Sequence, residues 1–218
     1  MTLKGKQLPR RILQYLAGLV CMVIGLVLLK RTNWGVSPIT AFPDAVANIT
    51  PLTLGNATIL LHVLCVILQI IVQKKITLKS ILCMFIGVPF GYLVDLFMWL
   101  WDPSMVLWQK IVSLILGIAV QGFGVALISG CDMMLPAPDE FNNVVARTYN
   151  KKLGNVKMCA DAVYVIIAIV INLVFQHSLA SVGISSVASV LLTGRFVQLS
   201  FKALPGIRMT PFFNAPKT

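Results

Sequence analysis

Six apolar runs, each long enough to cross a lipid bilayer, constrain the fold of this chain more than any other feature. They cover residues 12–29, 57–73, 80–101, 106–129, 157–176 and 181–201. A membrane-spanning helix needs about 20 mostly apolar residues, and a soluble domain of 218 residues has no interior that could bury six such runs. The sequence therefore predicts an all-α membrane protein with six transmembrane helices.

Composition supports the same fold class. Hydrophobic residues make up 58% of the chain and charged residues only 11%, whereas a soluble domain carries roughly 25% charged residues. So few charges cannot cover a surface that faces water, which excludes a conventional soluble enzyme, a disordered chain and a secreted disulfide scaffold. Residues 1–218 are expected to form a single polytopic membrane domain.

The positive charge of the chain follows its predicted topology. The net charge is +11, and the chain has 18 Lys and Arg residues. With a cytoplasmic N-terminus, fourteen of them fall on the inner side, and the outer side has only Lys30, Arg31 and Lys110. This bias is typical of a protein of the bacterial cytoplasmic (inner) membrane with both termini inside. Because topology and membrane lipid explain the basicity, no nucleic-acid partner is expected.

Two parts of the chain resemble each other at a spacing of about 99 residues. A Leu-Gly-Asn triplet opens an apolar run at 54–56 and again at 153–155, and a Val-Ala pair upstream of each triplet keeps the same spacing. We infer two repeats of three spans each, at about 12–101 and 106–201. An odd number of spans per repeat turns the second copy upside down, which is the inverted-repeat design of many secondary transporters.

A polar, proline-containing connection follows the first and the fourth predicted helices. The first, at 34–44, contains Ser37 followed by a proline, a pair that favours the start of a short helix. The second, at 130–143, places Asp139 and Glu140 in a first helical turn, where the helix dipole favours carboxylates. Both segments are interpreted either as re-entrant half-helices around a central cavity or as interfacial helices that lie flat on the membrane.

Ionisable side chains at membrane depth define the candidate site. Carboxylates inside a bilayer are energetically costly, so by default they face a partner, water or a substrate path. The expected inner group is Asp139, Glu140 and Asp161, and the expected outer group is Asp44, His62 and Asp95. The remaining candidates for substrate or ion binding are Ser37, Asn142 and Arg195.

His62 and Asp161 are predicted to be equivalent, because each lies six residues after the asparagine of its Leu-Gly-Asn triplet. Two interpretations remain open: both side chains belong to a proton or cation relay, or both lie near the ends of their spans and are hydrated at the interface. Arg195, in the sixth span, has three open roles. It extends to the cytoplasmic interface, pairs with Asp161 or Glu140, or binds an anionic substrate.

Several short motifs together resemble a known group of membrane proteins. They are Gly-Val-Ser-Pro at 35–38, the two Leu-Gly-Asn triplets, Gly87, Gly91 and Asp95, Pro-Asp-Glu at 138–140, Asp161, and the segment from Gly183 to Gly194. In this combination the chain resembles the YczE/YyaS/YitT-type bacterial multipass membrane proteins over about residues 12–201. The resemblance implies an integral inner-membrane protein of a group whose members are either uncharacterised or regarded as transporters, so it supports the fold more than a substrate and assigns no functional residue.

Motifs of catalysis and nucleotide binding are absent from the sequence. It has no HExxH, GxSxG, P-loop or GxGxxG motif, and its two histidines have no neighbouring ligands that would indicate a metal site. We therefore expect no enzyme and no cofactor, but a secondary transporter for a small polar, cationic or zwitterionic solute coupled to H⁺ or Na⁺. The alternatives are a substrate-capture subunit of a multi-component transporter and a non-transporting scaffold or regulator. The glycine-rich fourth helix permits a homodimer without requiring one.

Overall fold

The structure is a computed structural model that describes residues 2–101, 105–131, 133–177 and 181–207. Over these ranges the chain forms eight α-helices, a short 3-10 helix and no β-strand, so the predicted all-α fold class is confirmed there. The elements are α1 (Thr2–Arg31), α2 (Pro38–Ile49), α3 (Leu54–Gln73), α4 (Leu78–Leu100), α5 (Leu107–Gly130), α6 (Ala137–Thr148), α7 (Leu153–Gln176), α8 (Ile184–Ala203) and η1 (Pro205–Ile207).

Six of the helices are long and apolar enough to cross a membrane: α3, α4, α5, α7, α8 and the segment Leu8–Arg31 of α1. They coincide with the six apolar runs, so the prediction of a multi-pass membrane protein with six spans is confirmed. The other two helices, α2 and α6, have 12 residues each. At a rise of about 1.5 Å per residue, such a helix reaches about 18 Å and is too short to cross a bilayer.

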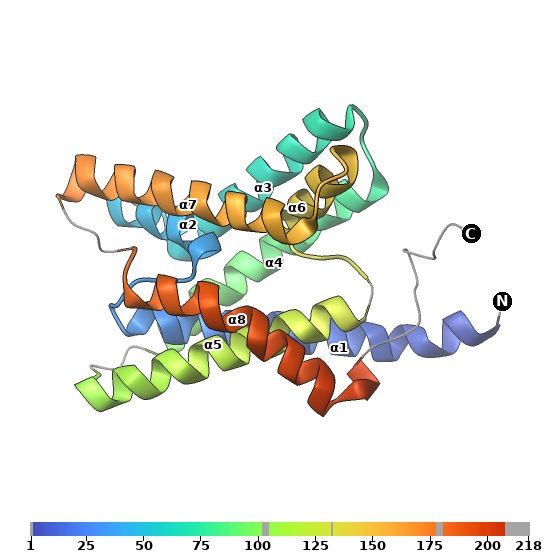
Figure 1. Ribbon diagram of the computed structural model, residues 1–218, viewed down its shortest axis with the longest axis horizontal. Helices are drawn as coiled ribbons and strands as arrows, with labels where there is room; N and C mark the ends of the chain where they lie inside the picture. The colour runs from blue at the N-terminus through green and yellow to red at the C-terminus, as the bar shows by residue number, and fades with distance from the viewer. Residues whose placement is uncertain (1, 102–104, 132, 178–180, 208–218) are drawn as a thin grey trace.

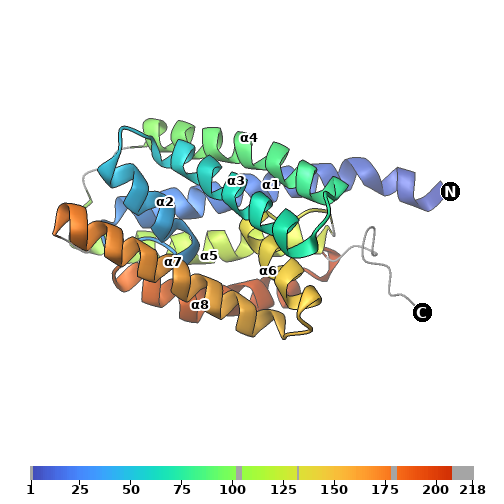
Figure 2. The ribbon, with the colours of Figure 1, turned by 90° about the horizontal axis from the view of Figure 1, so that it is seen from above.

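The helices form two groups that meet at the centre of the molecule (Figures 1 and 2). α1 and α5 lie beside each other in opposite directions, α8 packs along α5, and α4 packs against α1. In the second group, α2 and α6 each pack against both α3 and α7. α4 joins the two groups because it also packs along α3. Each short helix is therefore held between two membrane-spanning helices.

α1 and α5 approach each other through glycine residues. A Cβ atom added at Gly25 would lie 2.7 Å from the carbonyl oxygen of Gly117, and one added at Gly124 would lie 2.7 Å from that of Gly18. Side chains do not tolerate such distances, so only glycine lets the two backbones pack this closely. The contacts are reciprocal, since an atom added at Gly18 or Gly117 would also meet the backbone of the partner glycine.

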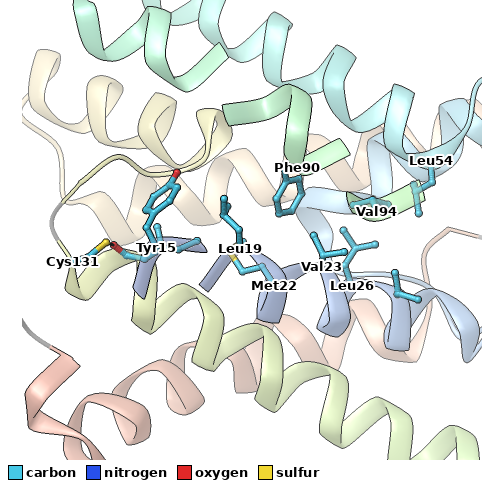
Figure 3. Packing of buried hydrophobic residues seen from close by; sticks show 11 residues of the cluster. Tyr15, Leu19, Met22, Val23, Leu26, Leu54, Phe90, Val94 and Cys131 are labelled. Carbon is cyan, nitrogen blue, oxygen red and sulfur yellow. Dashed lines mark hydrogen bonds between the residues drawn. The ribbon is translucent and has the colours of Figure 1, made fainter. Parts of the chain in front are cut away.

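One face of α1 forms the main hydrophobic core with α4. Figure 3 shows Tyr15, Leu19 and Val23 of α1 on the side that faces Phe90 and Val94 of α4. The α1 residues recur at every fourth position, which keeps them on one side of a helix. Lipid tails are as apolar as these side chains, so van der Waals packing, rather than exclusion from water, holds this interface together in a membrane.

The helix pairs α3–α4 and α7–α8 differ in how closely they pack. α3 and α4 pack along each other, and a side chain at Gly55 would clash with the carbonyl oxygen of Gly91. The backbones of α7 and α8 do not approach each other closely over their described residues. A Cβ atom added at Gly154 of α7 or Gly194 of α8 would meet nothing within 4 Å. A gap therefore separates α7 from α8, whereas α3 and α4 are in contact.

Candidate functional site

A central cavity of about 680 Å³ lies where the two groups of helices meet. All eight α-helices contribute to its lining, and most of the wall is apolar. Its size falls within the range of about 300 to 1,000 Å³ that is typical of small-molecule sites. The polar side chains among its lining residues are Ser37, Thr40, Thr58, His62, Gln121, Asp139, Lys157, Asp161, Ser189, Thr193 and Gln198.

Both short helices begin at the cavity. Ser37 and Pro38 line it at the start of α2, and Pro138 and Asp139 line it in the first turn of α6. The prediction that Ser37 precedes a helix start is confirmed, although its hydroxyl lies 2.8 Å from Thr40 Oγ1 and makes no capping bond to the backbone. The start of α2, which is the positive end of the helix dipole, faces the cavity. The first turn of α2 contains no acidic residue that would neutralise this partial positive charge.

His62 lies deep in the structure beside the cavity. The side chain is 3% exposed and packs against Gly87 and Phe90, so the interpretation of a hydrated residue at the interface is wrong for this histidine. Its Nδ1 donates a hydrogen bond of 2.8 Å to the carbonyl oxygen of Thr58. In the neutral ring, Nε2 is then a hydrogen-bond acceptor, and it has no partner among the described residues.

Gln121 of α5 and Ser189 of α8 add two further polar groups that the sequence analysis did not select. Gln121 donates through Nε2 to Ser37 Oγ at 3.4 Å, and its Oε1 is buried without a hydrogen-bond partner in the described part of the chain. Ser189 Oγ is likewise buried and without such a partner. A lone amide inside an apolar, glycine-rich run was the available signal for Gln121, because polar groups at membrane depth are costly.

Two predicted carboxylates meet at the α6–α7 end of the cavity. Lys157 Nζ of α7 forms an ion pair with Asp139 Oδ1 of α6 at 2.5 Å. Asp161, four residues after Lys157 on α7, also lines the cavity. Residues four apart share one face of a helix, so Lys157 and Asp161 project to the same side of α7. Two carboxylates and one ammonium leave this end with an excess of negative charge when all three are ionised.

Glu140 does not join this group, so the predicted cluster of three inner carboxylates is wrong in this respect. Its side chain faces a second, smaller cavity of about 350 Å³ that is also lined by Lys75, Lys79 and Arg147. Consecutive residues of a helix point about 100° apart, which sends Asp139 and Glu140 to different sides of α6. Asn143 Nδ2 donates to Glu140 Oε2 at 3.4 Å.

The predicted outer group is dispersed as well, because only His62 of its three members lines the central cavity. Asp44 is 1% exposed and forms an ion pair of 2.5 Å with Lys30 at the end of α1. Asp95 accepts hydrogen bonds from Thr53 Oγ1 at 2.6 Å and from the backbone N–H of Gly55 at 2.7 Å. These contacts fix the start of α3, so Asp95 has a structural task outside the cavity.

Replacing Asp95 by asparagine is therefore expected to lower the stability of the folded protein by about 1 to 2 kcal/mol, because a charged acceptor at the start of α3 becomes a neutral one. Thermal unfolding of the purified protein in detergent measures this change. An unfolding temperature equal to that of the wild type would show that the negative charge of Asp95 contributes nothing to the stability of the fold.

Arg195 and Asn142 also lie outside the central cavity. Arg195 is exposed on α8, and among the described residues no ion pair joins it to Asp161 or Glu140, so the predicted pairing is not formed in this structure. Asn142 is 1% exposed, and both polar atoms of its amide lack a hydrogen-bond partner within the described ranges. Among the described residues, no group of three His, Cys, Asp or Glu side chains could hold a metal ion.

A protein-family model matches most of the chain. The model describes a family of unknown function, DUF6198, and it covers residues 9–202, which include nearly all of the six membrane-spanning segments. The chain belongs to the DUF6198 family. No curated protein and no solved structure is detectably similar to it. The description of the DUF6198 family does not name the YczE/YyaS/YitT-type proteins, so the resemblance of the chain to those proteins stays a prediction.

Proposed function

We propose that this protein is a secondary transporter that moves a small cationic or zwitterionic solute across the bacterial cytoplasmic membrane, coupled to H⁺ or Na⁺. The central cavity carries this proposal, because all eight α-helices line it and its apolar wall contains two carboxylates. Carboxylates at membrane depth are costly, and in transporters they bind the cargo or the coupling ion. An ion gradient is the energy source that suits a chain without a nucleotide-binding motif.

The polar groups of the cavity favour a solute that donates hydrogen bonds and carries positive charge. His62 Nε2 and Gln121 Oε1 are buried acceptors, and within the described ranges nothing donates to them. The excess negative charge at Asp139 and Asp161 attracts an ammonium or similar group, which competes with Lys157 for the carboxylates. The carboxylate of a zwitterion would be stabilised at the opposite wall by the dipole of α2.

Contacts between α1 and α5 support two inverted repeats. Gly18 and Gly25 of α1 correspond to Gly117 and Gly124 of α5 at the spacing of 99 residues that relates the Leu-Gly-Asn triplets. The glycines meet crosswise, Gly18 against Gly124 and Gly25 against Gly117. Crosswise contact between corresponding residues is the pattern that a two-fold axis between two antiparallel helices produces.

Two further pairs with this spacing connect α3 and α7. Cys65 Sγ lies 3.5 Å from Tyr164 Oη, 99 residues away in sequence, and His62 and Asp161 line the same cavity. An axis that runs through the cavity accounts for both observations. In this proposal α2 and α6 are re-entrant half-helices that approach the cavity from opposite sides. Rocking of one repeat against the other then opens the cavity to each side of the membrane in turn.

The start of the first span lies beside the residues that follow the last span, which agrees with an even number of spans and with both termini in the cytoplasm. Gln14 Nε2 of α1 donates to the carbonyl oxygen of Ile207 at 2.9 Å, and Arg10 Nη2 donates to that of Gly206 at 3.2 Å. These contacts place the start of the first span and the residues after the last span on one side. The excess of basic residues on that side assigns it to the cytoplasm in this proposal.

A thermal-unfolding screen of the purified protein in detergent tests the proposed solute class. The additives are small ammonium compounds, amino acids and matched anions, each with and without Na⁺ at two pH values. A ligand at about 100-fold excess over its Kd raises stability by about 2.7 kcal/mol. We expect cations or zwitterions to stabilise the wild type and not Asp161→Asn. Stabilisation by anions alone would contradict the proposal, and no shift for any solute would favour a scaffold or regulator.

A further inference from the structure

The wall of the central cavity that α7 and α8 form differs from the opposite wall. Met158 of α7 and Val190 of α8 line the cavity and are 66% and 55% exposed. Leu26 of α1 and Leu61 of α3 also line it but are each only 4% exposed. Side chains that line a cavity and are also exposed mark its mouth, so the cavity opens to the outside between α7 and α8.

The mouth lies within the membrane-spanning part of the two helices. α7 and α8 are the least buried of the six spans, with 11% and 17% of their apolar windows buried, compared with 56% for α1. Apolar side chains cover their outer surfaces, for example Val163 and Ile166 of α7 and Leu191 of α8. Such a surface faces lipid in a membrane protein, so the mouth of the cavity opens toward the bilayer.

Two glycine residues line this mouth. Gly154 and Gly194 line the cavity from α7 and α8, and a Cβ atom at either position would meet nothing within 4 Å. At the other helix pair, Gly55 and Gly91 bring α3 and α4 into direct contact. Glycine thus lets α3 and α4 come into contact, whereas the glycines of α7 and α8 have no neighbouring helix within reach of a Cβ atom, which leaves the α7–α8 side of the cavity open toward lipid.

We propose that the solute is an amphiphilic organic cation that reaches the cavity sideways from the bilayer, between α7 and α8. This inference rests on the proposed transport function and specifies its substrate class. The cationic head is bound by Asp161 and Asp139, and the hydrophobic body lies along the apolar wall next to Val165 and Val197. Most of the wall is apolar, so a fully polar solute would lose more hydration than the polar groups of the cavity replace, whereas an amphiphile already resides in the bilayer next to the mouth.

Closing the mouth with a large side chain tests this route. Gly194→Trp introduces an indole at the mouth, at a position where an added Cβ atom would meet nothing within 4 Å. Val187→Trp is the matched control, since Val187 is on the same helix, is 63% exposed and is not among the residues that line the cavity. Both variants are reconstituted into liposomes and checked for folding by size-exclusion chromatography and thermal unfolding. Gly154→Trp provides a second closing variant from α7.

The probes are ethidium, an aromatic quaternary cation, and choline, a small polar quaternary cation. Both carry permanent charge, and ethidium uptake is followed by fluorescence on DNA enclosed in the liposomes. We expect saturable ethidium uptake that falls about tenfold or more in Gly194→Trp and stays within about twofold of wild type in Val187→Trp. Choline uptake is expected to be about tenfold slower than that of ethidium, because it lacks the hydrophobic body.

Two results would overturn the lateral route while leaving transport intact. One is ethidium uptake that is unchanged in Gly194→Trp but lost in Asp161→Asn. The other is faster uptake of choline than of ethidium, which would show that the cavity fills from water with a polar solute. If the folded wild type carries neither cation but is stabilised by another cation or a zwitterion in the thermal-unfolding screen, this inference fails and the proposed transport function stands.

Discussion

The Asp161→Asn variant is expected to lose more than about tenfold of its solute uptake in proteoliposomes. The substitution keeps the shape of the side chain but removes its negative charge. The positive charge of Lys157 then neutralises the negative charge of Asp139, so this end of the cavity has no excess negative charge. A cationic head group that enters this cavity would lose its bound water and would form no ion pair in return. The fold should persist, because burying an amide costs less than burying a carboxylate.

Asp95→Asn is the matched control for this experiment. It removes the same charge from another membrane-spanning helix, but Asp95 is bound to Thr53 and Gly55 outside the central cavity. We expect its uptake, divided by the amount of folded protein, to stay close to that of the wild type. Normal uptake in Asp161→Asn, or equal loss in both variants, would remove Asp161 from the proposed site.

The second large effect is expected at the glycine contact between α1 and α5. Gly25→Val should destabilise the protein by about 3 kcal/mol, because its Cβ atom would lie 2.7 Å from the carbonyl oxygen of Gly117 and from the backbone nitrogen of Gln121. Neither backbone atom can turn away as a flexible side chain would. The two helices would have to separate along the interface that joins the proposed repeats. Unfolding by SDS in mixed micelles measures the change in stability.

Gly154→Val is the control for the crowding at Gly25. Both variants replace a helical glycine by valine, but Gly154 has no atom within 4 Å of the added Cβ. Its stability is expected to stay within about 0.5 kcal/mol of the wild type. If Gly25→Val and Gly154→Val were equally stable, close glycine packing would not be what joins α1 to α5.

The membrane-spanning helices could be predicted because their signal is local. Length and apolarity alone identify a span, and a Ser-Pro pair alone marks the start of α2 at Ser37. These properties depend on a few neighbouring residues, so no knowledge of the packing was needed.

The grouping of the ionisable residues could not be predicted, because it depends on how the helices rotate and pack. Asp139 and Glu140 are neighbours in sequence, yet the rotation of α6 places them in different cavities. The depth of His62 depends on Gly87 and Phe90 of α4, which only the packing of α3 on α4 reveals. Gln121 stands out as an amide in an apolar run, but its contact with Ser37 and its place in the cavity wall depend on how α5 packs against the other helices.

Gradient-driven uptake by the wild type in proteoliposomes tests the central claim most directly. The protein is reconstituted with an imposed H⁺ or Na⁺ gradient, and the accumulation of ethidium and choline is compared with that in protein-free vesicles. The account predicts that at least one of the two cations accumulates above its equilibrium level and that collapsing the gradient abolishes this accumulation. Folded protein that accumulates neither cation under either gradient would contradict it.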